Sequence, residues 1–61
     1  MEHTTFSIYN DAYKMVSSGL IVHEVMYCFV EKGIDRSRFF IRDSYGLDMK
    51  FNEFLIFYYG G

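Results

Sequence analysis

The sequence predicts a small α+β domain in which one helix lies across a mixed sheet, in the order β-β-α-β-β. Three observations predict it: an alternating segment with a turn after it, a helical periodicity, and later aromatic strand-like segments, at residues 4–9, 22–32, 38–43 and 54–59. In this arrangement the first and last strands can lie parallel at the centre of the sheet, joined by a right-handed crossover.

Aromatic side chains, and not disulfides, are expected to hold so short a chain together. The 61 residues should form a single domain, residues 1–61, which buries only about 60% of its unfolded surface. Seven Phe and six Tyr supply large apolar areas for its core. Cys28 is the one cysteine, so no disulfide can form within the chain, and a reducing compartment is expected.

Charge and hydropathy exclude several classes of protein. The net charge of −2 is too small for a polyanionic mimic of DNA and has the wrong sign for a nonspecific nucleic-acid binder. The longest apolar run, Val25–Val30, is far shorter than a membrane span, and the first residues carry no secretory signal. We therefore expect a cytoplasmic protein that binds neither nucleic acid nor membrane.

The first two elements are predicted to form a hairpin. Residues 4–9 alternate like a half-buried strand, and Asn10-Asp11 suits a tight two-residue turn. A reversal at that turn gathers one apolar face from both strands: Phe6, Ile8, Tyr13 and Met15. The alternative is a helical turn over residues 11–18 that ends at Gly19.

A helix is predicted over Val22–Lys32. Apolar residues recur there at i, i+3, i+4 and i+7, which is one face of a helix: Val22, Val25, Met26 and Phe29. Gly33 is a suitable C-cap. The start of the helix is poorly marked, because Ile21 stands where Ser, Thr or Asp would normally cap.

The second half of the chain is predicted to return as two strands joined by a turn at Ser44-Tyr45-Gly46. In the first, Arg38–Asp43, the inward side chains are Phe39 and Ile41, and the outward ones are Arg38, Phe40 and Arg42. The last stretch also fits a helix, with Phe51, Phe54, Leu55 and Tyr58 on one face. Its lack of Ala and its many Phe and Tyr favour a strand over Phe54–Tyr59.

No catalytic or metal-binding arrangement is visible in the sequence. His23 and Cys28 are five residues apart, which on a helix separates them by roughly 140°, too far for a nucleophile–base pair. One Cys and two scattered His give no zinc spacing. If Glu53 were the last ligand of a calcium loop, Leu47 would stand at its obligatory Gly. We expect a protein that is not an enzyme and uses no metal or cofactor.

A basic and aromatic strand face is the first candidate binding surface. Arg36, Arg38 and Arg42 share this face with Phe40. Such a face can bind RNA or an acidic protein surface, but the arginines can equally pair with carboxylates across the sheet. We favour an acidic or apolar protein partner, because an exposed Phe40 needs a contact.

The final pair, Gly60-Gly61, is the second candidate. A diglycine end is thin and flexible, so it can enter a narrow enzyme channel and present an unhindered carboxylate. The plainer interpretations are a frayed end or a remnant of cloning.

The order and spacing of several short motifs are similar to those of a known family. They are the first strand with Asn10, then Gly19 ahead of the helix, Gly33-Ile34-Asp35, Asn52–Phe57, and Gly60-Gly61. Together they resemble the ubiquitin-like β-grasp sulfur carriers of the ThiS and MoaD type. The chain departs from that family in five places. Asp11 replaces the turn Gly, Ile21 replaces a capping Thr, the helix is about one turn longer, the segment Ser44–Asn52 is short, and the tail is short because Tyr59 directly precedes Gly60.

The resemblance implies a carrier that is itself acted upon. A partner enzyme would adenylate the Gly61 carboxylate with ATP, and a sulfur donor would convert it to a thiocarboxylate. The carrier would supply only its tail and a docking patch, for which the candidates are Arg38, Phe40, Arg42, Leu55, Phe57 and Tyr59.

Two other functions stay open. Residues with AT-rich codons dominate the chain, which together with its size and aromatics favours a phage or mobile-element protein that binds and inhibits a host enzyme. The second is a DNA-binding regulator with residues 11–32 as a helix-turn-helix, whose affinity would depend steeply on salt. Only a carrier needs Gly60-Gly61. The sequence does not indicate the oligomeric state.

Overall fold

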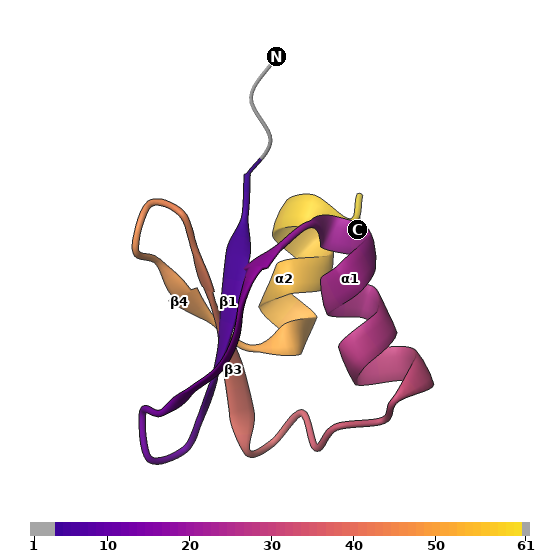
Figure 1. Ribbon diagram of the computed structural model, residues 1–61. Helices are drawn as coiled ribbons and strands as arrows, with labels where there is room; N and C mark the ends of the chain where they lie inside the picture. The colour runs from indigo at the N-terminus through magenta and orange to yellow at the C-terminus, as the bar shows by residue number, and fades with distance from the viewer. Residues whose placement is uncertain (1–3, 61) are drawn as a thin grey trace.

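The computed structural model describes residues 4–60 and shows an α+β domain of two layers. The elements follow one another as β1 (Phe6–Asn10), β2 (Met15–Leu20), α1 (Val22–Met26), η1 (Tyr27–Glu31), β3 (Phe39–Asp43), β4 (Asp48–Met49) and α2 (Phe51–Tyr58). The strands form one four-stranded sheet, and both α-helices lie on the same side of it (Figure 1). The other face of the sheet is covered by no helix or strand of residues 4–60.

The sheet has the strand order β2-β1-β3-β4, and every neighbouring pair is antiparallel. β1 pairs along its whole length with β3, from Phe6 opposite Asp43 to Asn10 opposite Phe39. The predicted mixed sheet, with parallel first and last strands at its centre, is therefore wrong. The reason is that the last segment is a helix, so β3 takes the place beside β1.

A hairpin joins β1 to β2, as predicted, but its turn is wider than two residues. The side-chain oxygen of Asn10 accepts hydrogen bonds from the backbone N–H groups of Ala12 and Lys14, both at 2.9 Å. Tyr13 takes a left-handed backbone conformation with φ 62°. The Asn10 side chain thus organises a longer loop, as Asn commonly does in turns.

The wider turn changes the register of the hairpin. Tyr9 lies opposite Met15, and Ile8 lies opposite Ser17, with irregularities in the pairing around them. Ile8 is buried, whereas Tyr13 and Met15 are exposed. The predicted apolar face shared by both strands is therefore wrong, and Met15 lies beside Tyr9 on the opposite face of the sheet.

The predicted helix over residues 22–32 is confirmed, as α1 followed by η1. Val25 and Phe29 are buried on the predicted face. η1 is a π-helical turn, in which the Lys32 N–H donates to the Tyr27 carbonyl at 3.0 Å. The chain leaves the helix at Gly33, whose φ of 70° suits the predicted C-cap.

The segment predicted as the last strand is instead α2. The predicted strand over Phe54–Tyr59 is wrong, and the helical alternative is correct. The four apolar residues on one face of this helix point toward the core: Phe51 and Phe54 are buried, and Leu55 and Tyr58 are half-buried. Burial of a Phe contributes about 1.5–3 kcal/mol, whereas β-propensities span only about 1 kcal/mol. Packing of these four residues therefore outweighs the preference of Phe and Tyr for strands.

Both α-helices start with the same hydrogen bond. A Glu at the third helical position accepts the backbone N–H of the residue before the helix: Glu24 from Ile21 at 2.9 Å, and Glu53 from Lys50 at 2.8 Å. This is one half of a capping box. It explains how a helix begins after Ile21, which has no capping side chain.

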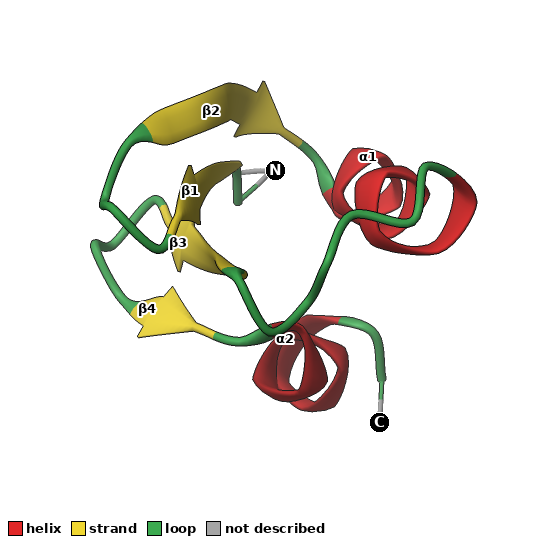
Figure 2. Cartoon of the chain, turned by 90° about the horizontal axis from the view of Figure 1, so that it is seen from below, coloured by secondary structure: helices red, strands yellow, loops and turns green. Residues whose placement is uncertain are grey.

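The core between the two layers is largely aromatic. Phe6 of the sheet meets Phe54 edge-on, with ring centres 5.1 Å apart, and Phe29 stacks on Phe51 at 4.7 Å. Figure 2 shows the sheet curving around the side on which α1 and α2 lie. The buried apolar residues are Phe6, Ile8, Val25, Phe29, Ile41, Met49, Phe51 and Phe54.

Candidate functional site

The sheet face turned away from the helices carries the candidate site (Figure 1). Side chains that alternate with the buried Ile8 and Ile41 point to this face, and the strand register pairs Tyr9 with Phe40 across it. The loop residue Tyr13 extends the same row. We call Tyr9, Tyr13, Phe40 and Arg42 the outer-face platform.

Three aromatic rings form a row across the platform. The rings of Tyr9 and Phe40 stack nearly parallel, with centres 5.4 Å apart and planes 11° apart. Tyr13 meets Phe40 edge-on, with centres 5.4 Å apart and planes 63° apart. Two strands and one tight loop hold these rings in place. Binding of a partner to the rings would therefore cost little side-chain conformational entropy.

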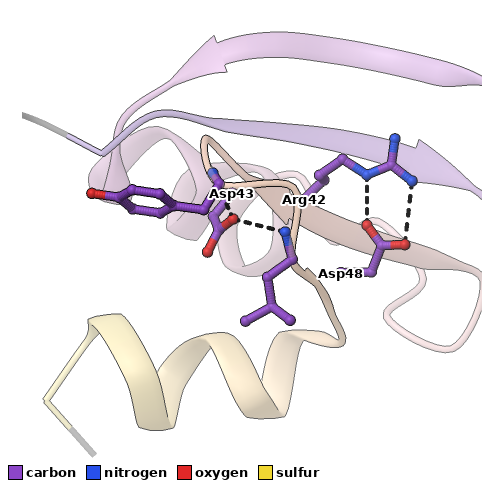
Figure 3. A network of polar contacts seen from close by, with 5 residues as sticks. Arg42, Asp43 and Asp48 are labelled. Atoms are coloured by element: carbon purple, nitrogen blue, oxygen red, sulfur yellow. Dashed lines mark hydrogen bonds and ion pairs between the residues drawn. The ribbon is translucent and has the colours of Figure 1, made fainter.

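Arg42 is fixed over the platform by an ion pair. Its Nε donates to Asp48 Oδ1 at 2.6 Å, and its Nη2 donates to Asp48 Oδ2 at 3.2 Å (Figure 3). Its guanidinium carbon lies 4.5 Å from the centre of the Tyr9 ring. The hydrogen bond to Asp48 raises the pKa of Arg42 above its ordinary value. Because Asp48 already balances this charge, Arg42 no longer argues for an acidic partner.

Tyr13 stands on a strained backbone and is 71% exposed. The left-handed conformation costs a residue with a Cβ roughly 1–2 kcal/mol, and a Gly would adopt it freely. The ring packs against Phe40 on the platform and stays out of the core. Strain that holds an exposed ring in place is a feature of binding and active sites.

An open cavity of about 340 Å³ adjoins the platform. Its wall combines two aromatic residues, one methionine, three carboxylates and one ammonium: Tyr13, Phe40, Met49, Asp11, Asp48, Glu53 and Lys50. The Lys50 ammonium donates to the backbone carbonyl of Ser37 at 3.4 Å. The cavity therefore has an aromatic side and an excess of negative charge.

Asp43 lies next to Arg42 in β3 but has a structural role. Its buried carboxylate accepts hydrogen bonds from the N–H groups of Tyr45 and Leu47, both at 2.9 Å (Figure 3). It also accepts one from the Tyr58 hydroxyl at 2.8 Å. Burial raises the pKa of the Asp43 carboxyl, but these hydrogen bonds outweigh burial and hold it below its ordinary value. Burial, and then the bond to Asp43, raise the pKa of Tyr58 to about 12.

The structure brings together only part of the predicted docking patch. Phe40 and Arg42 lie on the platform, and Arg38 is exposed just before β3. The other candidates belong to the helix layer: Leu55 and Phe57 in α2, and Tyr59 directly after it. They do not share a surface with Phe40, because the segment that carries them is not a strand of the sheet.

The predicted grouping of three arginines on one strand face is wrong. Arg36 precedes β3, and its guanidinium carbon lies 4.9 Å from the centre of the Phe51 ring, at the helix layer. Arg42 stands on the opposite face of the sheet, over Tyr9.

Tyr9 and Tyr13 are platform residues that the sequence analysis missed. A signal for Tyr9 was present, because the alternation of residues 4–9 already points it away from Phe6 and Ile8. No comparable signal existed for Tyr13, because its position depends on the width of the loop.

Of the predicted carrier tail, the structure describes only the first residue. Gly60 follows α2 with φ 90°, and Gly61 lies outside the described residues. Across residues 4–60, no three His, Cys, Asp or Glu side chains are grouped so that they could hold a metal ion. No helix in the same range has the length and apolar character needed to cross a membrane.

Comparison with known proteins gives no match at a significant level. None was found among protein-family models, among curated proteins or among solved structures. The geometry of the platform and its cavity is therefore the basis for the function proposed below.

Proposed function

We propose that this protein is a binding module that docks on a partner protein through the outer-face platform. The observation that carries the proposal is the row of Tyr9, Phe40 and Tyr13 on a sheet face that no helix or strand of residues 4–60 covers. Tyr and Arg are among the residues that most often dominate the energetics of protein interfaces. Removal of such apolar surface from water by a partner is favourable.

The charges around the platform favour protein over nucleic acid as the partner. Arg42 is paired with Asp48, and the adjoining cavity adds the carboxylates of Asp11 and Glu53. Nucleic-acid binding depends on unpaired basic groups that neutralise phosphates. The platform offers aromatic contact without that positive charge.

Capture from a lysate of the source cells tests the proposal with three immobilised forms of the protein. Wild type and Tyr45→Ser should retain the same proteins, because Tyr45 is 78% exposed but lies in the β3–β4 turn, outside the ring row. Tyr13→Asn should retain at most about one tenth as much of these proteins as wild type does, as expected for an interface hot spot. Equal retention by all three forms would exclude the platform as the docking surface.

The sulfur-carrier function stays a prediction. The ubiquitin-like β-grasp arrangement behind it places a strand before the tail, whereas this chain has α2 there. Incubation with an adenylating enzyme, ATP and sulfide, followed by measurement of intact mass, tests for replacement of oxygen by sulfur at Gly61. No such mass gain with several activating enzymes would refute it.

A further inference from the structure

We infer that the cavity beside the platform receives a lysine or arginine side chain of the partner protein. The inference rests on the proposed function and adds the chemistry of the partner, which would present a basic surface. Phe40 and Tyr13 provide aromatic rings at this cavity, and Asp11 and Glu53 provide carboxylates. A cation placed between rings and carboxylates is attracted by both.

The excess of negative charge on the cavity wall favours binding of a positively charged group. Three carboxylates, those of Asp11, Asp48 and Glu53, stand against the one ammonium of Lys50. Asp48 is already paired with Arg42, but Asp11 and Glu53 alone still outnumber Lys50. The hydrogen bond of Glu53 to the Lys50 N–H uses the oxygen Oε1, and Oε2 takes no part in it. An incoming cation therefore complements the wall, and an incoming carboxylate or phosphate does not.

The platform already contains the proposed interaction within the chain. Arg42 lies with its guanidinium carbon 4.5 Å from the Tyr9 ring centre and donates to Asp48. The cavity repeats this combination of ring and carboxylate with Phe40 and Glu53. Arg42 is not part of its wall, and its guanidinium carbon lies farther from the Phe40 ring centre, at 5.9 Å, than from that of Tyr9. A basic side chain from a partner would complete the second set.

The size of the cavity suits a single long side chain. Its volume of about 340 Å³ lies at the small end of the range for ligand pockets, about 300–1,000 Å³. Lys and Arg have apolar stems that pack on apolar surface while the charged head stays near polar groups. Phe40 and Tyr13, which line the cavity and are not buried, offer that apolar surface beside the carboxylates.

Blocked amino acids serve as probes that do not require the partner to be known. N-acetyl-lysine amide, N-acetyl-arginine amide, the neutral N-acetyl-norleucine amide and the anionic N-acetyl-glutamate amide are titrated into the full chain labelled with ¹⁵N. The lysine and arginine probes should shift the amide signals of Tyr13, Phe40 and Met49. Their weak affinity should fall further as salt is added.

Three substitutions test which features of the cavity bind the probe: two change the cavity wall, and one makes a charge change elsewhere on the protein. Glu53→Gln removes a carboxylate of the wall and keeps an oxygen that can accept the Lys50 N–H, so α2 keeps its start. It should weaken the lysine probe several-fold, and Phe40→Leu should weaken it about five-fold by removal of the ring. Glu31→Gln makes the same charge change on η1, away from this cavity, and should leave the probe affinity unchanged.

The outcomes distinguish failure of this inference from failure of the proposed function. Equal shifts with the norleucine probe would overturn the cation and leave an apolar docking site in place. Shifts with the glutamate probe alone, equal effects of Glu53→Gln and Glu31→Gln, or no shift with either basic probe would also overturn it. The proposed function is decided separately, by retention on the Tyr13→Asn form.

Discussion

Tyr13 is a residue at which stability and binding can be separated. Asn tolerates the left-handed conformation better than Tyr does, so Tyr13→Asn relieves part of the strain at φ 62°. It also removes the edge contact with Phe40, worth about 0.5–1.5 kcal/mol. We expect the two effects to offset each other, so that the free energy of unfolding in urea changes by less than about 1 kcal/mol.

A matched control is available for this variant. Tyr45→Ser removes an exposed ring from another loop and should be similarly mild. A loss of more than about 3 kcal/mol in the free energy of unfolding for Tyr13→Asn is typical of core truncations. The Tyr13 ring would then be part of the hydrophobic core, and the loss of binding would follow from the loss of stability.

Tyr58 and Asp43 connect the end of α2 to β3, and their hydrogen bond can be tested by substitution. Tyr58→Phe keeps the ring that meets Phe6 edge-on at 4.8 Å but removes the hydroxyl donor. The Asp43 carboxylate then keeps only its backbone donors. At neutral pH we expect a loss of about 1–3 kcal/mol in the free energy of unfolding, as for a hydrogen bond to a charged group.

The difference in stability between wild type and Tyr58→Phe should shrink at both extremes of pH. The folded pKa of Tyr58, about 12, exceeds its ordinary 10.0, so the unfolded chain loses that proton first, and wild type loses stability as pH rises from 10 toward 12. The folded pKa of Asp43 is below its ordinary 3.8, so the unfolded chain gains that proton first, and stability falls with pH below that value. Urea midpoints measured across this range test the expectation, and a constant difference would contradict it.

At the scale of elements, contacts between distant parts of the chain determine whether residues 51–59 form a strand or a helix. Residues 51–59 carry both a strand-like composition and a helical stripe, and only contacts with residues far away in the chain choose between them. As a helix, the segment brings Phe51 against Phe29 and Phe54 against Phe6. The helix over residues 22–32 was predictable because its periodicity and Gly33 agree. The hairpin register was not, because the Asn10 side chain widens the turn.

The start of α2 is expected to depend on one side chain. Glu53→Ala removes the acceptor of the Lys50 N–H and should cost about 0.5–1.5 kcal/mol in the free energy of unfolding. Glu53→Gln keeps an acceptor and should stay within about 0.5 kcal/mol of wild type. Thermal and urea denaturation of both variants measure this. Equal losses would mean that the charge, and not the hydrogen bond, stabilises the helix start.

At the scale of the whole molecule, residues 4–60 form one sheet and a layer of helices, and the helices cover only one face of the sheet. The abundant aromatics of the chain therefore divide between the core and the exposed face. Sequence alternation placed Phe40 and Arg42 correctly on that exposed face. The sequence could not show that Arg42 is neutralised by Asp48, or that the cavity beside Phe40 is acidic, because both depend on which strands are neighbours.

The same separation of faces yields a prediction for the end of the chain. The last backbone bond of the helical type runs from the Tyr59 N–H to the Leu55 carbonyl at 3.2 Å, so deletion of Gly60 and Gly61 leaves the hydrogen bonds of α2 intact. Tyr59 and Gly60 follow α2 in the helix layer, whereas the platform lies on the other face of the sheet (Figure 1). We therefore expect the free energy of unfolding to change by less than about 0.5 kcal/mol.

Binding of the captured partner, measured by calorimetry, should likewise be unchanged by this deletion, while Tyr13→Asn should weaken it about ten-fold or more. One variant changes the end of the chain and the other changes the platform, and both are expected to keep the fold. A deletion that removes function while stability and platform binding persist would place the active group in Gly60-Gly61, as the sulfur-carrier prediction requires. A deletion without effect would leave the platform as the functional surface of the molecule.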